Sequence, residues 1–454
     1  MNLRINKWIK ELLICEKEII NLPNIVYYGR LVGFNGSILE VSGLQLSLGS
    51  ICCIRKTLDI YNIDEVEAEV VGFKNGILFL MPLQSIEGIA LGSRVRPKVL
   101  GGINYVVNQL PIYEGLLGRV LDSTGKPLDD LKEIDKKYRK TLSYSAINPL
   151  HRNPIKDVLD TGIRAINALL TIGRGQRIGL FSSSGLGKSI LLGMMTKYTG
   201  ADVVILGLIG ERGREVKEFI ETILTKEALK KSVVVASPAE CSPLLQVQGA
   251  NYAVRIAEYF RDKNYHVLLI MDSLTRYAMA HREIALSIGE LPATKGYPPS
   301  VFSKIFSLIE RAGNGRKQQG SITAFYTVLS EEEETYDPIS DAARSILDGH
   351  IILSREYAES GHYPAINIET SISRVMSNIV DSIHDSKARY LKKLLSCYQR
   401  NRDLINVGAY VSGTNKELDL AISLLPKFQK FLQQGMHEKS TFTESKQDLY
   451  GLFN

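Results

Sequence analysis

A short run of serines and glycines followed by lysine and serine is the part of this sequence best suited to hold a triphosphate. It lies between an apolar strand predicted at 177–181 and an apolar helix predicted from Lys188, so the loop amides and the helix N-terminus would face one anion. Lys188 would reach the β- and γ-phosphates, and the Ser189 hydroxyl would ligate Mg²⁺. The predicted ATP-binding loop comprises Ser182, Ser183, Ser184, Gly185, Leu186, Gly187, Lys188 and Ser189.

Ser182 stands where the G-x-x-x-x-G-K-[ST] pattern has its first glycine. A residue with a Cβ resists the positive φ that glycine accepts, so this departure lowers the specificity of the match. A chance match to the pattern and a scaffold with a decayed phosphate loop therefore both stay open. The flanking strand and helix, and the acidic residues that follow in the chain, argue against both.

An apolar strand that ends in an acid comes about eighty residues later, at 266–272, and its last residue is Asp272. Ligands bind at the carboxyl ends of buried parallel strands, so this carboxylate is expected to hold Mg²⁺ together with Ser189. A simple strand cap is the alternative for Asp272. Mg²⁺ with ATP is the predicted cofactor.

A second buried strand, predicted at 203–209, leads into Glu211 and Arg212. If this strand lies beside the strand of the phosphate loop, Glu211 can orient a water for in-line attack on the γ-phosphate. Arg212 would neutralise the charge that develops there. Glu215 falls in the first turn of the next helix, where a carboxylate meets the helix dipole favourably, so we expect a structural role for it.

The composition is that of an ordinary globular protein with more than one domain. The chain has 454 residues, 44% of them hydrophobic and 23% charged, and a net charge of +6. That length exceeds the roughly 250 to 300 residues at which single hydrophobic cores stop growing. The five cysteines, which show no metal-binding spacing, are expected to be reduced thiols; they are Cys15, Cys52, Cys53, Cys241 and Cys397.

The N-terminal residues 1–24 are predicted to form an amphipathic helix that ends at Pro23. Ile5, Trp8, Ile9 and Leu12 follow helical spacing, and charged residues interrupt each apolar run before it could act as a secretion signal. Nothing in the chain is long enough to cross a bilayer. The helix either packs on its own domain or presents the only tryptophan to a partner.

Residues 25–100 are predicted to form a small β-barrel, because short strands alternate with turn signals such as Asn35-Gly36 and Asn75-Gly76. A hexameric RNA helicase would use such a barrel to bind nucleic acid and is the main rival reading. The first 100 residues hold 11 basic and 10 acidic side chains, whereas a barrel that follows an RNA backbone should be basic. We therefore expect no nucleic-acid partner.

Residues 101–380 are predicted to form the nucleotide domain and residues 381–454 a C-terminal helical domain. Asp160 or Thr161 is expected to cap a helix just ahead of the phosphate-loop strand. The acidic run at 331–334 is expected to be a solvated loop. After residue 381 apolar residues recur at helical spacing without strand-like runs.

Three segments of the chain resemble the flagellar protein-export ATPases: residues 210–215, residues 272–277 and residues 293–302. The resemblance covers nearly the whole chain. This family is similar to the catalytic β subunit of rotary ATP synthases and to the ATPases of type III secretion injectisomes. The resemblance implies an α/β, RecA-like P-loop fold with an N-terminal β-barrel and a helical C-terminus.

The resemblance also implies roles for individual residues. Arg276 matches a phosphate-contacting arginine, with a surface ion pair as the alternative. Tyr363 matches a tyrosine that stacks on adenine, and Phe431 matches a second adenine contact, although core packing explains either ring as well. Arg374 matches an arginine finger that reaches the neighbouring protomer's γ-phosphate, again with a surface ion pair as the alternative.

Finally, the resemblance implies a cytoplasmic homohexamer beneath the export gate of the flagellar basal body. Its partners would be a regulatory stator-like export subunit at the N-terminal helix, export-gate membrane proteins, export substrates and chaperones. A non-catalytic nucleotide-binding subunit of a rotary ATPase is a further alternative, against which Glu211 beside Arg212 argues.

Overall fold

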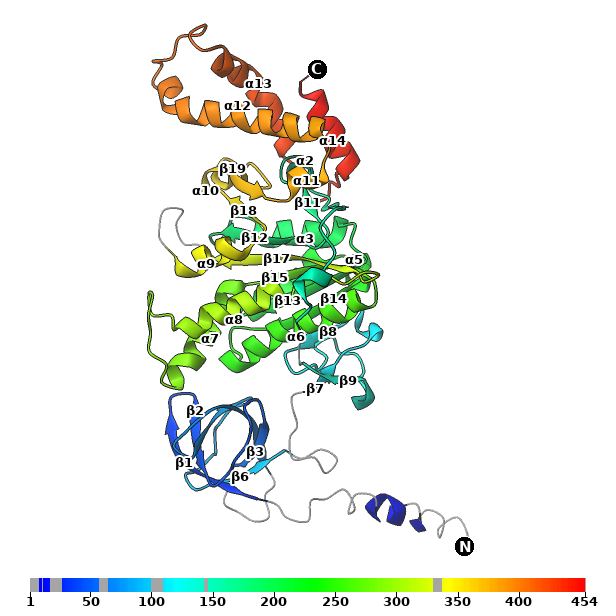
Figure 1. Ribbon diagram of the computed structural model, residues 1–454, viewed down its shortest axis with the longest axis vertical. Helices are drawn as coiled ribbons and strands as arrows, with labels where there is room; N and C mark the ends of the chain where they lie inside the picture. Colours follow the sequence, from blue (N-terminus) through cyan, green and yellow to red (C-terminus); the bar gives the residue numbers. More distant parts are fainter. Residues whose placement is uncertain are drawn as a thin grey trace. The chain divides into compact units, whose positions relative to one another are not determined.

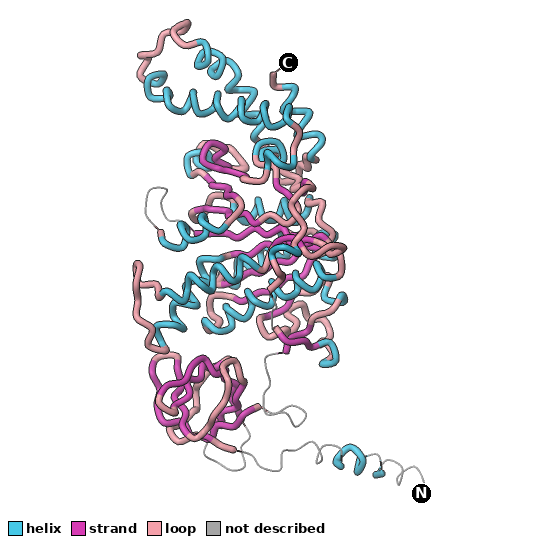
Figure 2. Tube along the Cα trace, viewed as in Figure 1, coloured by secondary structure: helices cyan, strands magenta, loops and turns pink. Residues whose placement is uncertain are grey.

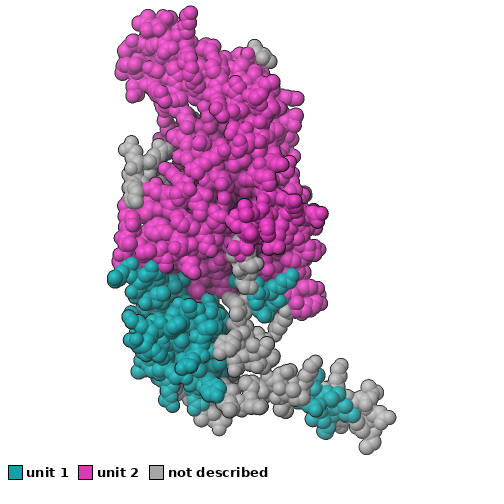
Figure 3. Space-filling model, viewed as in Figure 1, with its two compact units in different colours: residues 1–110, 139–142, 283–291 teal, residues 111–138, 143–282, 292–454 magenta. Residues whose placement is uncertain are grey.

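The computed structural model describes residues 8–9, 11–16, 27–56, 64–98, 109–142, 146–329 and 337–453. The chain divides into two compact units, coloured separately in Figure 3. The first unit contains residues 1–110, 139–142 and 283–291, and the second contains residues 111–138, 143–282 and 292–454. Three short segments that the sequence assigned to the nucleotide domain, residues 101–110, 139–142 and 283–291, thus group with the first unit.

The first unit is built on a closed barrel of six strands (Figure 2). Asn75 and Gly76 both have positive φ, 52° and 77°, and form the two-residue hairpin that their sequence predicts. Alternate side chains of each strand fill the barrel interior, as β-strand geometry requires. The strands are β1 (Gly29–Asn35), β2 (Ile38–Ser42), β3 (Ile51–Arg55), β4 (Glu65–Lys74), β5 (Ile77–Pro82) and β6 (Arg94–Pro97), in the order β1-β2-β5-β4-β3-β6.

The second unit is built on a mostly parallel sheet (Figure 1). Its central strands are continuous apolar runs because both faces of the sheet are covered. The strands are β8 (Val120–Asp122), β12 (Arg177–Ser182), β13 (Val203–Ile209), β14 (Ser232–Ser237), β15 (His266–Asp272), β16 (Gly313–Asn314), β17 (Ser321–Leu329), β18 (Gly349–Leu353) and β19 (Ile366–Ser373). The order is β19-β18-β12-β17-β15-β13-β14-β8, with β16 paired to β17 and with β19 antiparallel to β18.

The sequence led us to expect the strand β13 beside the phosphate-loop strand β12. In the structure the two strands are not neighbours. β17 and β15 lie between them. Neighbours along the chain need not be neighbours in a parallel sheet, because each crossover can place the next strand elsewhere. The carboxyl ends of all four strands nevertheless lie at one edge of the sheet, since the four are parallel.

Helices cover both faces of the sheet (Figure 1). The helix α6 packs across β13, β14 and β15, and α9 packs near β12 and β17. Apolar side chains of α3 pack with the facing side chains of β12, β13 and β15 in one large core. The helices of this part are α2 (Arg164–Leu169), α3 (Lys188–Tyr198), α4 (Gly213–Glu218), α5 (Lys226–Lys230), α6 (Pro243–Asp262), α7 (Leu274–Ser287), α8 (Pro299–Glu310), α9 (Pro338–Ile346), α10 (Arg355–Glu359) and α11 (Met376–Ile379).

The C-terminal part is helical, as predicted, with α12 (Ser382–Asn406), α13 (Lys416–Leu432) and α14 (Phe442–Gly451). The three helices share the core of α2 and α3 rather than forming a separate one. His384 Nε2 in α12 lies 2.7 Å from the carbonyl oxygen of Ala168 in α2. The C-terminal helices are therefore anchored directly to the helix that precedes the phosphate-loop strand.

Near the N-terminus, residues 8–9 and 11–16 are helical, and the rest of the predicted helix lies outside the described residues, as does the acidic run at 331–334. Trp8 is 63% exposed and Leu12 is 67% exposed. The apolar stripe of this helix is therefore open to solvent. The described helices include none that is long and apolar enough to span a membrane, and no cysteine forms a disulfide.

Candidate functional site

The phosphate loop connects β12 to α3 at the carboxyl edge of the sheet. Ser182 is the last residue of β12, pairs with Leu329 and keeps an extended backbone. A side chain costs nothing in an extended conformation, so serine is accommodated at this position without strain. Positive φ occurs at Gly185 (83°) and at Gly187 (80°), and Gly187 is the second glycine of the pattern.

Lys188 begins α3, and its ammonium lies between two carboxylates. Lys188 Nζ donates to Asp272 Oδ1 at 2.6 Å and to Glu211 Oε1 at 3.3 Å. Asp272 Oδ1 also accepts a hydrogen bond of 2.6 Å from the hydroxyl of Thr327 in β17. The structure thus brings together the three residues that the sequence assigned to phosphate binding, metal binding and catalysis.

The charges of this cluster perturb one another strongly. Burial raises the pKa of Glu211 to about 7, and the nearby carboxylate of Asp272 adds to this effect. Burial alone would lower the pKa of Lys188, but the charges of Asp272 and Glu211 outweigh it and the pKa is raised. A carboxylate with a pKa near 7 is poised to accept a proton at neutral pH.

A small cavity of about 20 Å³ lies beside this cluster and is lined by Ser189, Glu211, Glu215 and Asp272, together with apolar residues. Its polar atoms are hydroxyl and carboxylate oxygens, which are the hard ligands that Mg²⁺ prefers. A cavity of this size is large enough for one water-sized group. The residues present therefore fit the predicted magnesium ion, with the nucleotide phosphates as its remaining ligands.

A larger cavity of about 350 Å³ also borders the phosphate loop. Its lining includes Gly185 and Gly187 of the loop, the ring residue Tyr363 and residues 434–436. A Cβ added at Gly187 would come within 3.3 Å of the Tyr363 ring, so loop and ring lie in close contact. The size and the mostly apolar lining suit a flat heterocyclic base.

Phe431 does not line this cavity. It is 6% exposed, belongs to the core that joins α13 to the sheet, and borders a separate cleft of about 920 Å³ that Tyr363 also borders. Its predicted contact with adenine stays a prediction, and core packing accounts for its position.

The two predicted phosphate-binding arginines near Glu211 differ in their surroundings. The aliphatic part of Arg276 packs against Gly210, where an added Cβ would approach to 2.7 Å. The buried Nε of Arg276 has no hydrogen-bond partner among the described residues. Arg212 is 84% exposed and lies 3.8 Å from the Glu215 carboxylate. Arg276 thus packs on Gly210, the residue before Glu211, whereas Arg212 is exposed to solvent.

Arg374 lies at the opposite edge of the sheet from the phosphate loop. Ile366, at the start of β19, pairs with the last residue of β18, whereas Ser373 pairs with the first. Because β18 is parallel to β12, Arg374 follows β19 at the amino-terminal edge of the sheet. Its exposed guanidinium donates to the carbonyl of Arg344 at 3.2 Å. This arginine therefore does not belong to the phosphate site of its own chain.

Sequence reasoning missed Thr327 and Gln434. Thr327 fixes the Asp272 carboxylate from the neighbouring strand, and only the strand order could have indicated it. Gln434 Oε1 accepts the amide hydrogen of Arg164 at 2.7 Å. The predicted cap of α2 by Asp160 or Thr161 is therefore wrong at this amide: Asp160 and Thr161 instead accept from Gly162 and Ile163, ahead of the helix.

Two family models match the chain. The ATP synthase alpha/beta family, nucleotide-binding domain, matches residues 162–373, and the T3SS EscN ATPase C-terminal domain matches residues 380–450. A flagellum-specific ATP synthase of Buchnera aphidicola subsp. Baizongia pistaciae is 66% identical over the whole of both chains. The flagellum-specific ATP synthase of Salmonella typhimurium is 57% identical over 100% of this chain and 99% of its own.

Two solved structures of a type III secretion ATPase are similar to this chain over most of its length. The assembled ATPase EscN from the type III secretion system of enteropathogenic E. coli has a TM-score of 0.86 at 38% identity, and the match covers 94% of this chain and 100% of that one. EscN in complex with its central stalk EscO has a TM-score of 0.83 at the same identity and coverage.

Proposed function

The chain belongs to the family of flagellum-specific ATP synthases and is a flagellar export ATPase, and from that premise we propose that it hydrolyses ATP with Glu211 as the catalytic base. Family membership removes the RNA helicase, the non-catalytic subunit and the decayed scaffold as alternatives. The observation that carries the proposal is the contact of Lys188 with Glu211 and Asp272 at one edge of the sheet.

Glu211 orients a water molecule and takes its proton as it attacks the γ-phosphate. The raised pKa of Glu211, caused by burial and then by Asp272, supports this role. Lys188 moves its charge from the two carboxylates to the β- and γ-phosphates as nucleotide enters. Arg276, whose Nε has no hydrogen-bond partner among the described residues, supplies a donor to the same phosphates. The exposed side chain of Arg212 can move from solvent to contact the γ-phosphate.

Ser189 and Asp272 would hold Mg²⁺ at the small cavity beside Glu211. Bound there, the ion would supply positive charge that neutralises the phosphates. Thr327 keeps the Asp272 carboxylate oriented through its hydrogen bond from β17.

The adenine base enters the 350 Å³ cavity and stacks on Tyr363. This ring is 44% exposed, so one face is free to receive a base. The close contact between Gly187 and Tyr363 couples the base cavity to the phosphate loop.

The active form is a homohexameric ring in which Arg374 completes the phosphate site of the next protomer. The position of Arg374 at the far edge of its own sheet supports this arrangement, as does the assembled state of EscN. A ring of this kind would couple hydrolysis to the unfolding and delivery of export substrates.

Within the cell the ring works at the cytoplasmic face of the flagellar basal body, with export-gate proteins, export substrates and chaperones as its further partners. The N-terminal helix binds a stator-like regulatory subunit, and its exposed apolar stripe around Trp8 supports that role. The barrel binds no nucleic acid, since its strands carry balanced charges.

The proposal is tested by measuring Mg²⁺-dependent ATP hydrolysis of the purified chain across protein concentration. Specific activity should rise steeply with concentration, because each site needs a second protomer. Lys188→Ala serves as the inactive control. Specific activity that does not change from nanomolar to micromolar protein would contradict a site shared between protomers.

A further inference from the structure

The base cavity is closed by a turn from the C-terminal part of the chain. Residues 434–436 line it, and they follow the end of α13 at Leu432. A turn outside regular structure keeps its position only through contacts made by its own residues and by its neighbours. Tyr363, the proposed base-stacking ring, receives one of them: its carbonyl accepts the amide hydrogen of Gln434 at 3.0 Å.

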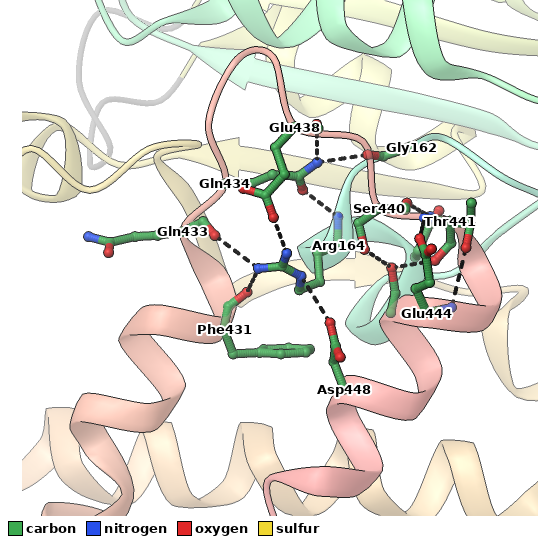
Figure 4. Close-up of polar contacts among 12 residues, drawn as sticks. Gly162, Arg164, Phe431, Gln433, Gln434, Glu438, Ser440, Thr441, Glu444 and Asp448 are labelled. Atoms are coloured by element: carbon green, nitrogen blue, oxygen red, sulfur yellow. Dashed lines mark hydrogen bonds and ion pairs between the residues drawn. The ribbon is translucent and has the colours of Figure 1, made fainter.

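Arg164, the first residue of α2, contacts this turn through its guanidinium (Figure 4). Its Nη1 donates to the carbonyl of Phe431 at 3.3 Å and to that of Gln433 at 3.2 Å. Its Nη2 donates to the carboxylate of Glu438, and its Nε lies 3.3 Å from Asp448 in α14. One guanidinium therefore joins the end of α13, the turn and α14.

Glu438 connects Arg164 to the cavity wall, because its carboxylate contacts both Arg164 and Gly435. The second oxygen of its carboxylate accepts the amide hydrogen of Gly435 at 3.2 Å, and Gly435 lines the cavity. The first oxygen is the one that pairs with Arg164. The wall is thus fixed through a chain of two charge-assisted contacts.

Gln434 adds a second connection between the same segments (Figure 4). Its side-chain oxygen accepts from the amide of Arg164 at 2.7 Å, and its nitrogen donates to the carbonyl of Gly162 at 2.8 Å. Gln434 is 5% exposed, so these bonds are shielded from water. Any displacement of Arg164 must therefore displace a residue that lines the cavity.

Only arginine suits this position. Its planar fork donates to three acceptors in different directions and lies near the Asp448 carboxylate, whereas a lysine ammonium on a single stem would reach one or two acceptors. The side chain is 16% exposed, so its charge-assisted bonds are stronger than those on an open surface.

We propose that Arg164 is a positioning residue for the nucleotide base: it sets the 433–438 turn, and through it the wall of the base cavity, without itself lining that cavity. This inference rests on the proposed function, in which the 350 Å³ cavity receives adenine. Loss of Arg164 should weaken recognition of the base while the phosphate loop stays intact.

The test compares Arg164→Gln and Arg164→Lys with Arg119→Gln in the full-length protein. Arg119 is the matched control, because it pairs with Asp129 through two nitrogens and donates to a carbonyl, but does so at the β8 edge of the sheet. We expect Arg164→Gln to raise the KM for ATP about tenfold with kcat within twofold, and Arg164→Lys to fall between it and the parent. The inhibition constant of tripolyphosphate, which has no base, should stay unchanged in both, and Arg119→Gln should match the parent.

Equal weakening of ATP and tripolyphosphate, a fall in kcat without a change in KM, or no effect would each overturn the role of Arg164. Tyr363→Ala separates this failure from that of the proposed function. If Tyr363→Ala left the KM for ATP unchanged, the base would not occupy the cavity. If only Arg164→Gln left it unchanged, the cavity would hold the base without help from Arg164.

Discussion

At the scale of single residues, the cluster of Lys188, Glu211 and Asp272 sets the chemistry. A lysine placed between two acids stabilises both carboxylates, and binding of phosphate must compete with that pairing. Because of this competition, nucleotide binding changes the site: the Lys188 ammonium that binds the phosphates no longer pairs with Glu211 and Asp272.

Replacing Glu211 by glutamine should lower the turnover of ATP by 100-fold or more and leave nucleotide affinity within a few-fold of the parent. The amide keeps the size of the side chain but cannot accept the proton of the attacking water, and general-base catalysis is worth about 10² to 10⁴ in rate. Steady-state ATPase rates and titration with a fluorescent ATP analogue measure the two effects.

Glu215→Gln is the matched control, since Glu215 lines the same small cavity. It should retain most of the activity, whereas Lys188→Ala should lose both binding and turnover. Hydrolysis by Glu211→Gln at a rate within a few-fold of the parent would remove Glu211 from the role of base.

Much of this site could be predicted from the sequence, because the phosphate loop and the acid at the end of a buried strand are local patterns. The roles of Lys188, Ser189 and Asp272 can be predicted from the few residues around each of them. Thr327 and Arg164 do not, since their roles depend on which strand or turn lies next to them. The effect of Ser182 could not be predicted, because the pattern does not state the backbone conformation of its first position.

At the scale of elements, the strand β4 of the barrel carries an unusual acid. Glu65 pairs with Arg96 and Glu67 with Lys98, but burial raises the pKa of Glu69 to about 7. The folded state therefore keeps a proton on Glu69 that the unfolded chain releases near its ordinary value of 4.5. By this linkage, the stability of the protein falls as pH rises from about 4.5 to about 7.

Glu69→Gln should therefore stabilise the protein at pH 8, by about 1 kcal/mol or more, and change little at pH 5. Urea unfolding of parent and variant at the two pH values measures this difference. Glu67→Gln on the same strand is the control and should give no gain, because it removes a partly exposed ion pair. An equal effect of Glu69→Gln at both pH values would show that Glu69 does not titrate in this range.

The elements themselves followed from local physics. Continuous apolar runs gave buried parallel strands, and Asn75-Gly76 gave a tight hairpin. The order of the strands did not follow, because the sequence does not say where each crossover returns to the sheet. The position of β17 between β12 and β15 became clear only from the fold.

At the scale of the whole molecule, the separation between Arg374 and the phosphate loop predicts complementation between protomers. Arg374→Ala and Lys188→Ala proteins should each be nearly inactive, but an equal mixture should recover activity. In randomly mixed rings about a quarter of the interfaces would join an intact phosphate loop to an intact Arg374. ATPase assays after subunit exchange measure the recovery.

Mixing Lys188→Ala with Glu211→Gln is the control, because both lesions lie in the same half of the site and no interface would be intact. Full activity of Arg374→Ala alone would exclude the finger. Inactivity of the first mixture, after proof of subunit exchange, would exclude action across the boundary.

The strand β19 has a further consequence for such a ring. It starts shortly after Tyr363 and ends just before Arg374, so eight residues connect a protomer's own base cavity to the finger that it would offer its neighbour. Both ends of the strand pair with β18, Ile366 with Leu353 and Ser373 with Gly349, so a shift of β18 would reach both ends together. Binding of a nucleotide in one subunit would then control when the next subunit hydrolyses its ATP. Hydrolysis would proceed from subunit to subunit around the ring and not at random.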